Sequence, residues 1–231
     1  MKVGIIQSNF LPWRGYFDFI REVDLFILED DVQYTKGDWR NRNRIKTLRG
    51  AEWITVPVSY KRTSQLILET PIDYSTAWTK KMLNRIRESY RTAPCFEPYF
   101  SELDEFLNQP AASISDLNLT LIRWVCRRLD INTPLAFSQD YHPQGTKTER
   151  VVSILRQVGA TVYVSGPTGA NYLVPHLFEE VGIKLEYKKY DFPEYEQLHP
   201  PFDPGVSVLD LLFMKGAEAK YFLAYSKEQP A

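Results

Sequence analysis

The sequence has few of the residues that build cross-linked or metal-dependent folds. It contains two cysteines, Cys95 and Cys126, and three histidines in 231 residues. Two cysteines are too few for a disulfide framework, so we expect reduced thiols. The histidines, His142, His176 and His199, do not approach metal-ligand spacing, so they give little support to a zinc site, and we assign no metal ligand among the candidate site residues.

The sequence also lacks an excess of charge and a long apolar run. Lys and Arg number 28 and Asp and Glu number 29, so the formal net charge is −1, and nothing global favours a polyanionic or polycationic partner. No apolar stretch reaches the ~18 residues of a membrane helix, and the first ten residues lack the apolar core of a signal peptide. We therefore expect a cytoplasmic protein with no membrane partner.

Apolar residues make up 44% of the chain and aromatic residues 14%. This composition is ordinary for a domain with a sizeable core, and the length favours a single α/β domain over residues 1–231. Packing is the simple explanation for the aromatic residues. A second is that some of them line a pocket for a sugar or a nucleobase.

Short apolar runs alternate with helical spacing, which predicts an α/β fold with a parallel sheet and right-handed crossovers. Strands are expected at residues 2–7, 24–31, 52–61, 133–140, 161–166 and 183–190, and helices at 15–23, 146–160, 171–182 and, as two short pieces separated by Gly216, 205–226. Residues 32–50 are polar without a clear period, which indicates an ordered loop. Residues 75–130 have helical spacing throughout and are predicted to be a helical insertion, with Thr76 and Ser115 as helix caps.

In open α/β sheets, ligands bind beyond the carboxyl ends of the strands. The loop after the first strand, QSNFLPWRGYF, offers Gln7, Asn9 and Tyr16 as hydrogen-bonding groups, and we expect it to form the floor of a site. Its Gly15 would let a phosphate approach the backbone.

Two later loops are candidates for binding an anion. SGPTGANY has glycines that suit a phosphate or carboxylate cradle, with a structural turn as the alternative. In TKTERVV, a hydroxyl and a guanidinium lie near a helix start, where a helix cap with a surface salt bridge is the alternative. The candidate substrate-binding residues of these loops are Thr148, Arg150, Ser165, Gly166, Gly169 and Tyr172.

The basic segment DWRNRNRIK offers Arg42 and Asn43 to a small anion such as a nucleotide phosphate, and a solvated loop is the alternative. A nearly neutral chain with one short basic stretch is a poor match to nucleic-acid binding. Asp30 and Asp31 either bind Mg²⁺ with nucleotide phosphates or simply end a strand. Gln197 and His199 lie in a polar loop near the carboxyl end of the chain, where Gln197 is a candidate to bind substrate and His199 would shuttle a proton or be merely solvated.

Six separated blocks of the sequence resemble the WbqC-like family, whose members are encoded in bacterial O-antigen and other surface-polysaccharide gene clusters. The matching blocks are GIIQSNFLPWRGYFDFI, DDVQYTKGDWRNRNRI, WITVPV, TERVV, TVYVSGPTGANYL and YEQLHPPFDPGVSVLDLLF. The opening loop is more distantly similar to HIGH-motif nucleotidylyltransferases, but WRGY (13–16) stands where H-x-G-H would be. This second resemblance implies a Rossmann-like, three-layer fold and nucleotide chemistry without the usual histidines.

Together these resemblances imply an enzyme, a transferase or ligase, that modifies a nucleotide-linked deoxyamino sugar by acyl or aminoacyl transfer to its amine. Tyr16 and His199 are the catalytic candidates, and ATP with Mg²⁺ is the cofactor that such chemistry would use. The expected partner is a small nucleotide or amino sugar and not nucleic acid. The alternative is a non-catalytic nucleotide-sugar-binding module within a biosynthetic complex.

Overall fold

A five-stranded parallel sheet organises the fold of residues 1–224, the part of the chain that the computed structural model describes. The strand order is β5-β2-β1-β6-β7, and each neighbouring pair is parallel. The strands are β1 (Lys2–Ile6), β2 (Leu25–Leu28), β5 (Leu135–Phe137), β6 (Val162–Ser165) and β7 (Lys184–Tyr187). The order runs outward from β1 in both directions, as in Rossmann-like sheets, so the topology reverses between β1 and β6.

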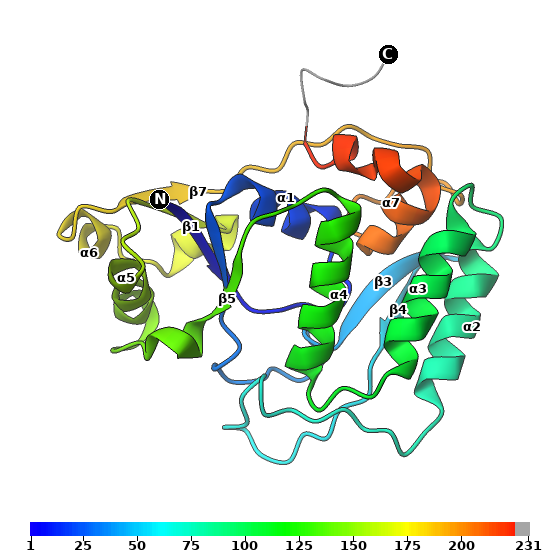
Figure 1. The fold of residues 1–231 in the computed structure, drawn as a ribbon, viewed down its shortest axis with the longest axis horizontal. Helices are drawn as coiled ribbons and strands as arrows, with labels where there is room; N and C mark the ends of the chain where they lie inside the picture. Colours follow the sequence, from blue (N-terminus) through cyan, green and yellow to red (C-terminus); the bar gives the residue numbers. More distant parts are fainter. Residues whose placement is uncertain (225–231) are drawn as a thin grey trace.

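Helices cover both faces of the sheet, which gives the predicted three layers (Figure 1). Phe26 of β2 packs in a cluster with residues of α1 (Arg14–Glu22) and α4 (Ile114–Arg128). The next residue, Ile27, packs on the opposite face with residues of α5 (Lys147–Gln157) and α6 (His176–Glu179). This division follows from the two-residue period of a strand, because successive side chains point to opposite faces.

The predicted loop at residues 32–50 is wrong in its second half, which is a β-strand. Strand β3 (Arg42–Thr47) pairs with β4 (Gly50–Thr55) in an antiparallel hairpin. The inward positions of β3 include Asn43, a polar residue that is 2% exposed. Its polarity hides the alternation of apolar and polar residues by which a half-buried strand is recognised. Pro57 lies beyond β4, which ends earlier than expected.

Three helices occupy the range predicted to be helical, α2 (Trp78–Tyr90), α3 (Phe96–Asn108) and α4. The predicted caps are wrong. Ala77 precedes α2 without a side-chain hydrogen bond, and Ser113, with Asp116, caps α4. Ser115 instead donates its hydroxyl hydrogen to Asp30, over 2.5 Å.

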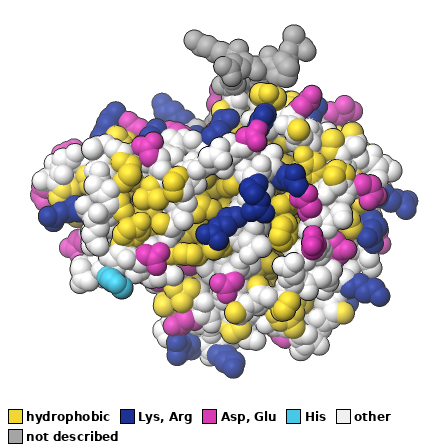
Figure 2. Space-filling view, viewed as in Figure 1, with side chains coloured by type: hydrophobic (Ala, Val, Ile, Leu, Met, Phe, Trp, Pro, Cys, Tyr) yellow, Lys and Arg dark blue, Asp and Glu magenta, His cyan; other side chains and the backbone are white. Residues whose placement is uncertain are grey.

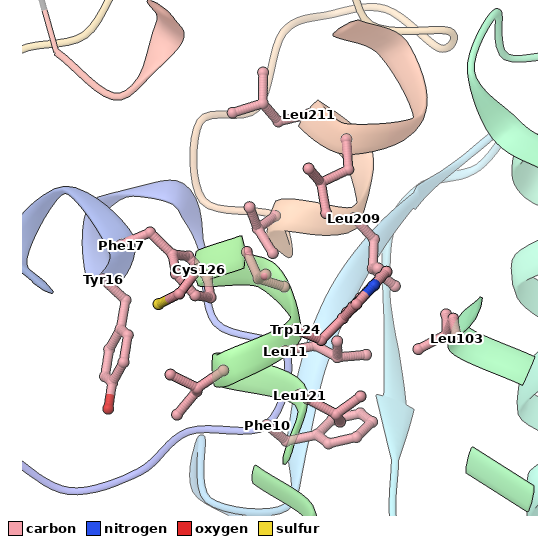
Figure 3. Close-up of a cluster of buried hydrophobic side chains, with 14 of the residues drawn as sticks. Phe10, Leu11, Tyr16, Phe17, Leu103, Leu121, Trp124, Cys126, Leu209 and Leu211 are labelled. Carbon is pink, nitrogen blue, oxygen red and sulfur yellow. The ribbon is translucent and has the colours of Figure 1, made fainter. Parts of the chain in front are cut away.

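Helix α4 also belongs to the sheet domain, because its apolar residues pack in the same cluster as those of α1. Figure 3 shows Trp124 and Cys126 of α4 with Tyr16 and Phe17 of α1. Leu209 from α7 (Val208–Lys215) joins the same cluster. The helical segment is therefore packed into the core that underlies the opening loop.

The predicted helix at residues 171–182 is broken. The chain forms a 3-10 helix, η2 (Pro167–Asn171), and then the single turn of α6, with Pro175 at its N-cap. The remaining 3-10 helices are η1 (Ser138–Tyr141) and η3 (Gly216–Phe222). Helix α7 and η3 meet at Gly216, as expected for two short helical pieces, although residues 225 and 226 of the predicted range lie outside the described residues.

Charges of both signs are interspersed on the face seen in Figure 2, where a group of Lys and Arg side chains lies close to acidic ones. This pattern agrees with the balanced composition. Within residues 1–224, no helix has the length and hydrophobicity needed to cross a bilayer. Both cysteines are free thiols.

Candidate functional site

The loop that follows β1, residues 7–13, is here called the opening loop. Phe10 and Leu11 within it are fully buried, and the Phe10 amide donates to the Trp39 carbonyl over 2.9 Å. Leu11 has a φ of 41°, in the left-handed region that a side chain with a Cβ disfavours by about 1–2 kcal/mol. Surrounding contacts must therefore hold this conformation in place.

Asn43 supplies the main contact. Its Nδ2 donates to the carbonyl oxygens of Phe10, over 3.0 Å, and Leu11, over 2.8 Å, and its Oδ1 accepts from the Arg44 amide over 2.8 Å. Both hydrogens of the amide are therefore used by the backbone. Asn43, a predicted substrate-binding residue, joins the opening loop to the hairpin.

The segment before α7 closes the third side of this arrangement. The Ser207 amide donates to the Arg44 carbonyl over 2.8 Å, and the Val208 amide donates to the Pro12 carbonyl over 2.9 Å. Trp13 and Ser207 form an isolated antiparallel bridge. The opening loop therefore lies between the hairpin and a segment that is distant in sequence.

These three segments enclose a cavity of about 310 Å³, here called the loop pocket. It is lined by Asn9, Pro12, Trp13, Trp39, Asn43, Arg44 and Gly205. Two polar atoms of its lining residues, Asn9 Oδ1 and Arg44 Nε, are buried without a hydrogen-bond partner. Buried polar atoms are normally paired, so these two are candidates to meet a ligand.

Two tryptophans give the pocket its apolar surface. Trp13 is held by edge contacts with Tyr190, 5.0 Å between ring centroids, and Phe192, at 5.6 Å. Trp39 is 39% exposed and lies 5.1 Å, centroid to centroid, from Trp53 of β4. Aromatic rings beside amide and guanidinium groups suit a sugar or a nucleobase.

Gly15 serves the packing of Trp13. A Cβ built at Gly15 would lie 2.3 Å from the Trp13 ring, so the indole already fills the space that the missing side chain leaves. The predicted approach of a phosphate to the Gly15 backbone is therefore blocked by the neighbouring ring.

Tyr16 lies beneath the opening loop and is 3% exposed. Its hydroxyl donates to the backbone carbonyl of Gln7 over 3.1 Å. Burial, together with the charge of Asp30, raises the pKa of Tyr16 well above its ordinary value. In this position it supports the loop from the core side.

The Gln7 side chain lies at the sheet edge, where its Oε1 accepts from Arg40 Nη1 over 3.3 Å. Beside it, the buried Asp30 carboxylate accepts from the Ser8 amide over 2.8 Å and from Ser115. Asn118 of α4 donates to Ser8 Oγ over 3.0 Å. Asp30 therefore ties β2, the opening loop and α4 together, which fits the strand-ending alternative better than Mg²⁺ binding.

A second polar group, here called the edge cluster, comprises Glu29, Asp31, Ser138 and Arg150. Arg150 Nε lies 3.1 Å from Glu29 Oε1, and its Nη2 lies 2.6 Å from Asp31 Oδ2. Ser138 donates to Asp31. Burial raises the pKa of Glu29 although Arg150 opposes the shift. Arg150, predicted to bind substrate, is already paired with two carboxylates.

The loop after β6 surrounds this side of the sheet edge. Thr148 is buried and its hydroxyl accepts from the Val174 amide over 3.2 Å, while Ser165 donates to the Gly166 carbonyl over 3.2 Å. A Cβ at Gly169 would lie 2.1 Å from Ser165 Oγ, so this glycine permits a close approach of the chain to itself. No atom crowds Gly166, and the Tyr172 side chain is 60% exposed.

His199 and Gln197 lie away from the loop pocket lining. His199 Nε2 is 3.0 Å from the Ser89 carbonyl oxygen. The His199 side chain lines a different, open hollow of about 580 Å³ between the hairpin turn and α2. Gln197 is 8% exposed. Its Nε2 donates to the Asp203 carbonyl over 3.0 Å, and its Oε1 accepts from the Asp203 amide over 2.8 Å. These contacts stabilise the loop before α7.

The structure thus divides the predicted site residues into separate groups. Asn9 and Asn43 meet in the loop pocket, and the residues from 148 to 172 lie on the β6 side of the sheet edge. The pocket residues that the sequence did not single out include Trp39, Arg44 and Gly205. In residues 1–224, no three His, Cys, Asp or Glu side chains are grouped so as to hold a metal ion.

The fold and this pocket define an α/β protein with a parallel sheet and a candidate small-molecule site next to its carboxyl edge. A family model described as the WbqC-like protein family matches residues 7–221, and the chain belongs to that family. It is 45% identical over 234 residues to the uncharacterized protein Rv1507c of Mycobacterium tuberculosis, covering 98% of this chain and 99% of the relative. No solved structure matches it significantly.

Proposed function

We propose that the protein binds a nucleotide-linked deoxyamino sugar in the cytoplasm and modifies its amine for surface-polysaccharide assembly. The observation that carries the proposal is the loop pocket, with two tryptophans, an unpaired amide oxygen and an arginine around about 310 Å³. Ligand pockets span about 300–1,000 Å³. This one is at the lower end, which favours a single ring of the ligand inside and the remainder outside.

The residues of the pocket suit different parts of such a ligand. The Trp13 and Trp39 faces suit the C–H faces of a pyranose. Asn9 Oδ1 is an acceptor for a hydroxyl or amine hydrogen, and the Arg44 guanidinium suits a phosphate oxygen. Asp203 Oδ1 lies 3.9 Å from Arg44 Nη2, so a carboxylate is available beside the pocket for the ammonium group of the sugar.

Acyl or aminoacyl transfer to the amine requires a base and an activated carboxyl group. In the proposed step the amine loses a proton to a base, for which Asp203 is our candidate, and forms a bond to the carbonyl carbon while the bond to the leaving group breaks. With ATP and Mg²⁺, attack of the carboxylate on the α-phosphorus of ATP would release pyrophosphate and form an acyl adenylate, from which AMP would leave when the amine attacks. The Rossmann-like strand order supports such nucleotide chemistry, and likeness to HIGH-motif nucleotidylyltransferases is part of this proposal.

Turnover is the direct test. The protein is incubated with a panel of nucleotide-linked amino sugars, ATP, Mg²⁺ and carboxylates, and the products are measured by mass spectrometry. A mass gain at the sugar amine with release of AMP supports the proposal, and its absence across the panel counts against it. Asn9→Ala should weaken sugar-nucleotide binding about fivefold, since one hydrogen bond is worth roughly 1 kcal/mol. Asn108→Ala, on the exposed end of α3, is the matched control and should bind normally.

A non-catalytic binding module is the second candidate. Two observations favour it, the engagement of the Tyr16 hydroxyl with backbone and the distance in the fold between His199 and the loop pocket lining. It predicts binding of the same ligands in the loop pocket without turnover. Binding without product, in the presence of every co-substrate of the panel, would favour this candidate.

A further inference from the structure

The hairpin and the residues just before it carry an exposed aromatic surface next to the loop pocket. Trp53 of β4 is 40% exposed and Trp39 is 39% exposed, and their ring centroids are 5.1 Å apart. Large aromatic side chains normally contribute to a core or an interface. Trp39 also lines the loop pocket, so the two features are continuous.

Two arginines flank this surface. Arg44 pairs directly with Trp53 across the hairpin, so their side chains share one face. The Arg42 guanidinium lies 4.2 Å from the Trp53 ring centroid, and its atoms lie 3.7–3.8 Å from the position that a Gly37 Cβ would take. Arg42 is therefore held between Trp53 and the Gly37 backbone.

The charge of Arg42 is uncompensated. Within residues 1–224 it forms no ion pair, and its Nε is buried without a hydrogen-bond partner. Arg44 faces Asp203 only at 3.9 Å, and its Nε is likewise unpartnered. Two exposed tryptophans, tilted by 45° to each other, with two arginines beside Trp53 suit a planar ring joined to an anion.

We propose that Trp39, Trp53 and Arg42 form a nucleotide subsite. The base of a nucleotide-linked sugar stacks on the tryptophans, its diphosphate lies against Arg42 and Arg44, and its sugar enters the loop pocket. The inference rests on the proposed function for the identity of the complete ligand. The loop pocket is too small to hold a whole sugar nucleotide, and this surface accounts for the remaining part.

Calorimetric titration tests the subsite with UDP, dTDP, inorganic pyrophosphate and free glucosamine as probes. Wild-type protein should bind UDP or dTDP, and Trp53→Ala should weaken this binding about 5- to 150-fold, the range for removal of a base–aromatic stack. Trp53→Phe should lose less than Trp53→Ala, because a ring remains. Arg42→Ala should weaken nucleoside diphosphate and pyrophosphate binding together. Leu48→Ala at the hairpin turn, 89% exposed, is the control and should bind normally.

Several outcomes would overturn the subsite. These are no nucleotide binding at millimolar concentration, equal affinity of the wild type and Trp53→Ala, or a uridine oligonucleotide that binds through Trp53 more tightly than UDP. If Trp53→Ala fails to fold, tryptophan fluorescence of the wild type and Trp53→Phe tests whether the base stacks on Trp53. UDP should quench the wild type more than it quenches Trp53→Phe at saturation, and equal quenching would reject the stack. UDP binding that depends on Trp53, without turnover, would contradict the proposed enzyme activity and would still support the nucleotide subsite.

Discussion

Replacing Asn43 with alanine tests whether one side chain holds the opening loop. The substitution removes donors to two buried carbonyls, those of Phe10 and Leu11, and the acceptor of the Arg44 amide. A buried polar group left unpaired costs about 1–3 kcal/mol. Since water and loop movement would recover part of this, we expect a loss of about 2–4 kcal/mol. That is a large part of the roughly 5–15 kcal/mol that stabilises a domain.

Urea denaturation and thermal unfolding, both followed by circular dichroism, measure the loss. The melting temperature should fall by about 4–16 °C, because domains of this size lose roughly 2–4 °C for each kcal/mol. Asn41→Ala is the matched control, since its Nδ2 makes one comparable bond, to the Val56 carbonyl over 2.7 Å. It should cost about half as much. A loss below about 1 kcal/mol for Asn43→Ala, or one no larger than that of Asn41→Ala, would refute the reasoning.

Asn43→Asp sharpens the same test, because it keeps the shape and replaces the amide donor with an oxygen. The carboxyl group would be buried against two carbonyl oxygens, so its pKa in the folded state should be raised above about 3.9, the unfolded value. The unfolded state then releases this proton at lower pH than the folded state. Stability relative to wild type should therefore fall as pH rises above about 4, and a pH-independent difference would contradict this geometry.

Three further predictions concern other parts of the chain. Gly15→Ala should displace Trp13 and destabilise the protein by up to about 2 kcal/mol, because overpacking outweighs the gain in helix propensity. Urea denaturation measures this loss, and Gly166→Ala, with open space around it, is the control. Burial raises the pKa of Tyr34 to about 12, so the folded state keeps this proton above pH 10, where the unfolded state loses it. Stability should therefore fall as pH rises from about 10 to 12, which urea midpoints and tyrosinate absorbance would measure. Burial also raises the pKa of Cys126 to about 12, so a thiol reagent should modify the other cysteine in the native protein and Cys126 only on unfolding.

The central sheet could be predicted from sequence because its strands are short apolar runs with strong turn residues around them. Residues such as Val3 and Ile27 are buried on one face of the sheet, and Phe26 and Leu28 are buried on the other. A continuous apolar run therefore indicates a strand that is covered on both faces. The first strand of the hairpin, β3, could not be recognised in this way, although a strand was expected where β4 lies. Asn43 occupies an inward position as a hydrogen-bond donor, and hydrophobic periodicity does not detect such a residue.

The candidate site was only partly predictable, because it is assembled from three distant segments. The strand-end rule identifies the opening loop, and the run of arginines and asparagines draws attention to the start of β3. Nothing local in the sequence indicates that Gly205 and Ser207 lie against them, since backbone bonds such as Ser207 to Arg44 make that contact. Asn9 and Asn43 could therefore be named in advance, whereas the pocket wall that they share with Gly205 required the structure.

Several polar backbone groups of the opening loop are hydrogen-bonded to side chains within the protein. Its carbonyls are met by Asn43, its Ser8 amide by Asp30, and the carbonyl of Gln7 by Tyr16. In the proposed likeness to HIGH-motif nucleotidylyltransferases, Trp13 and Tyr16 would stand at the two histidine positions, and here Trp13 lines the loop pocket while Tyr16 is buried in the core. The charge stabilisation that those histidines provide would therefore have to come from arginines. Arg42 and Arg44 on the neighbouring hairpin have unpartnered donors, so any nucleotide chemistry is better sought there than at the loop itself.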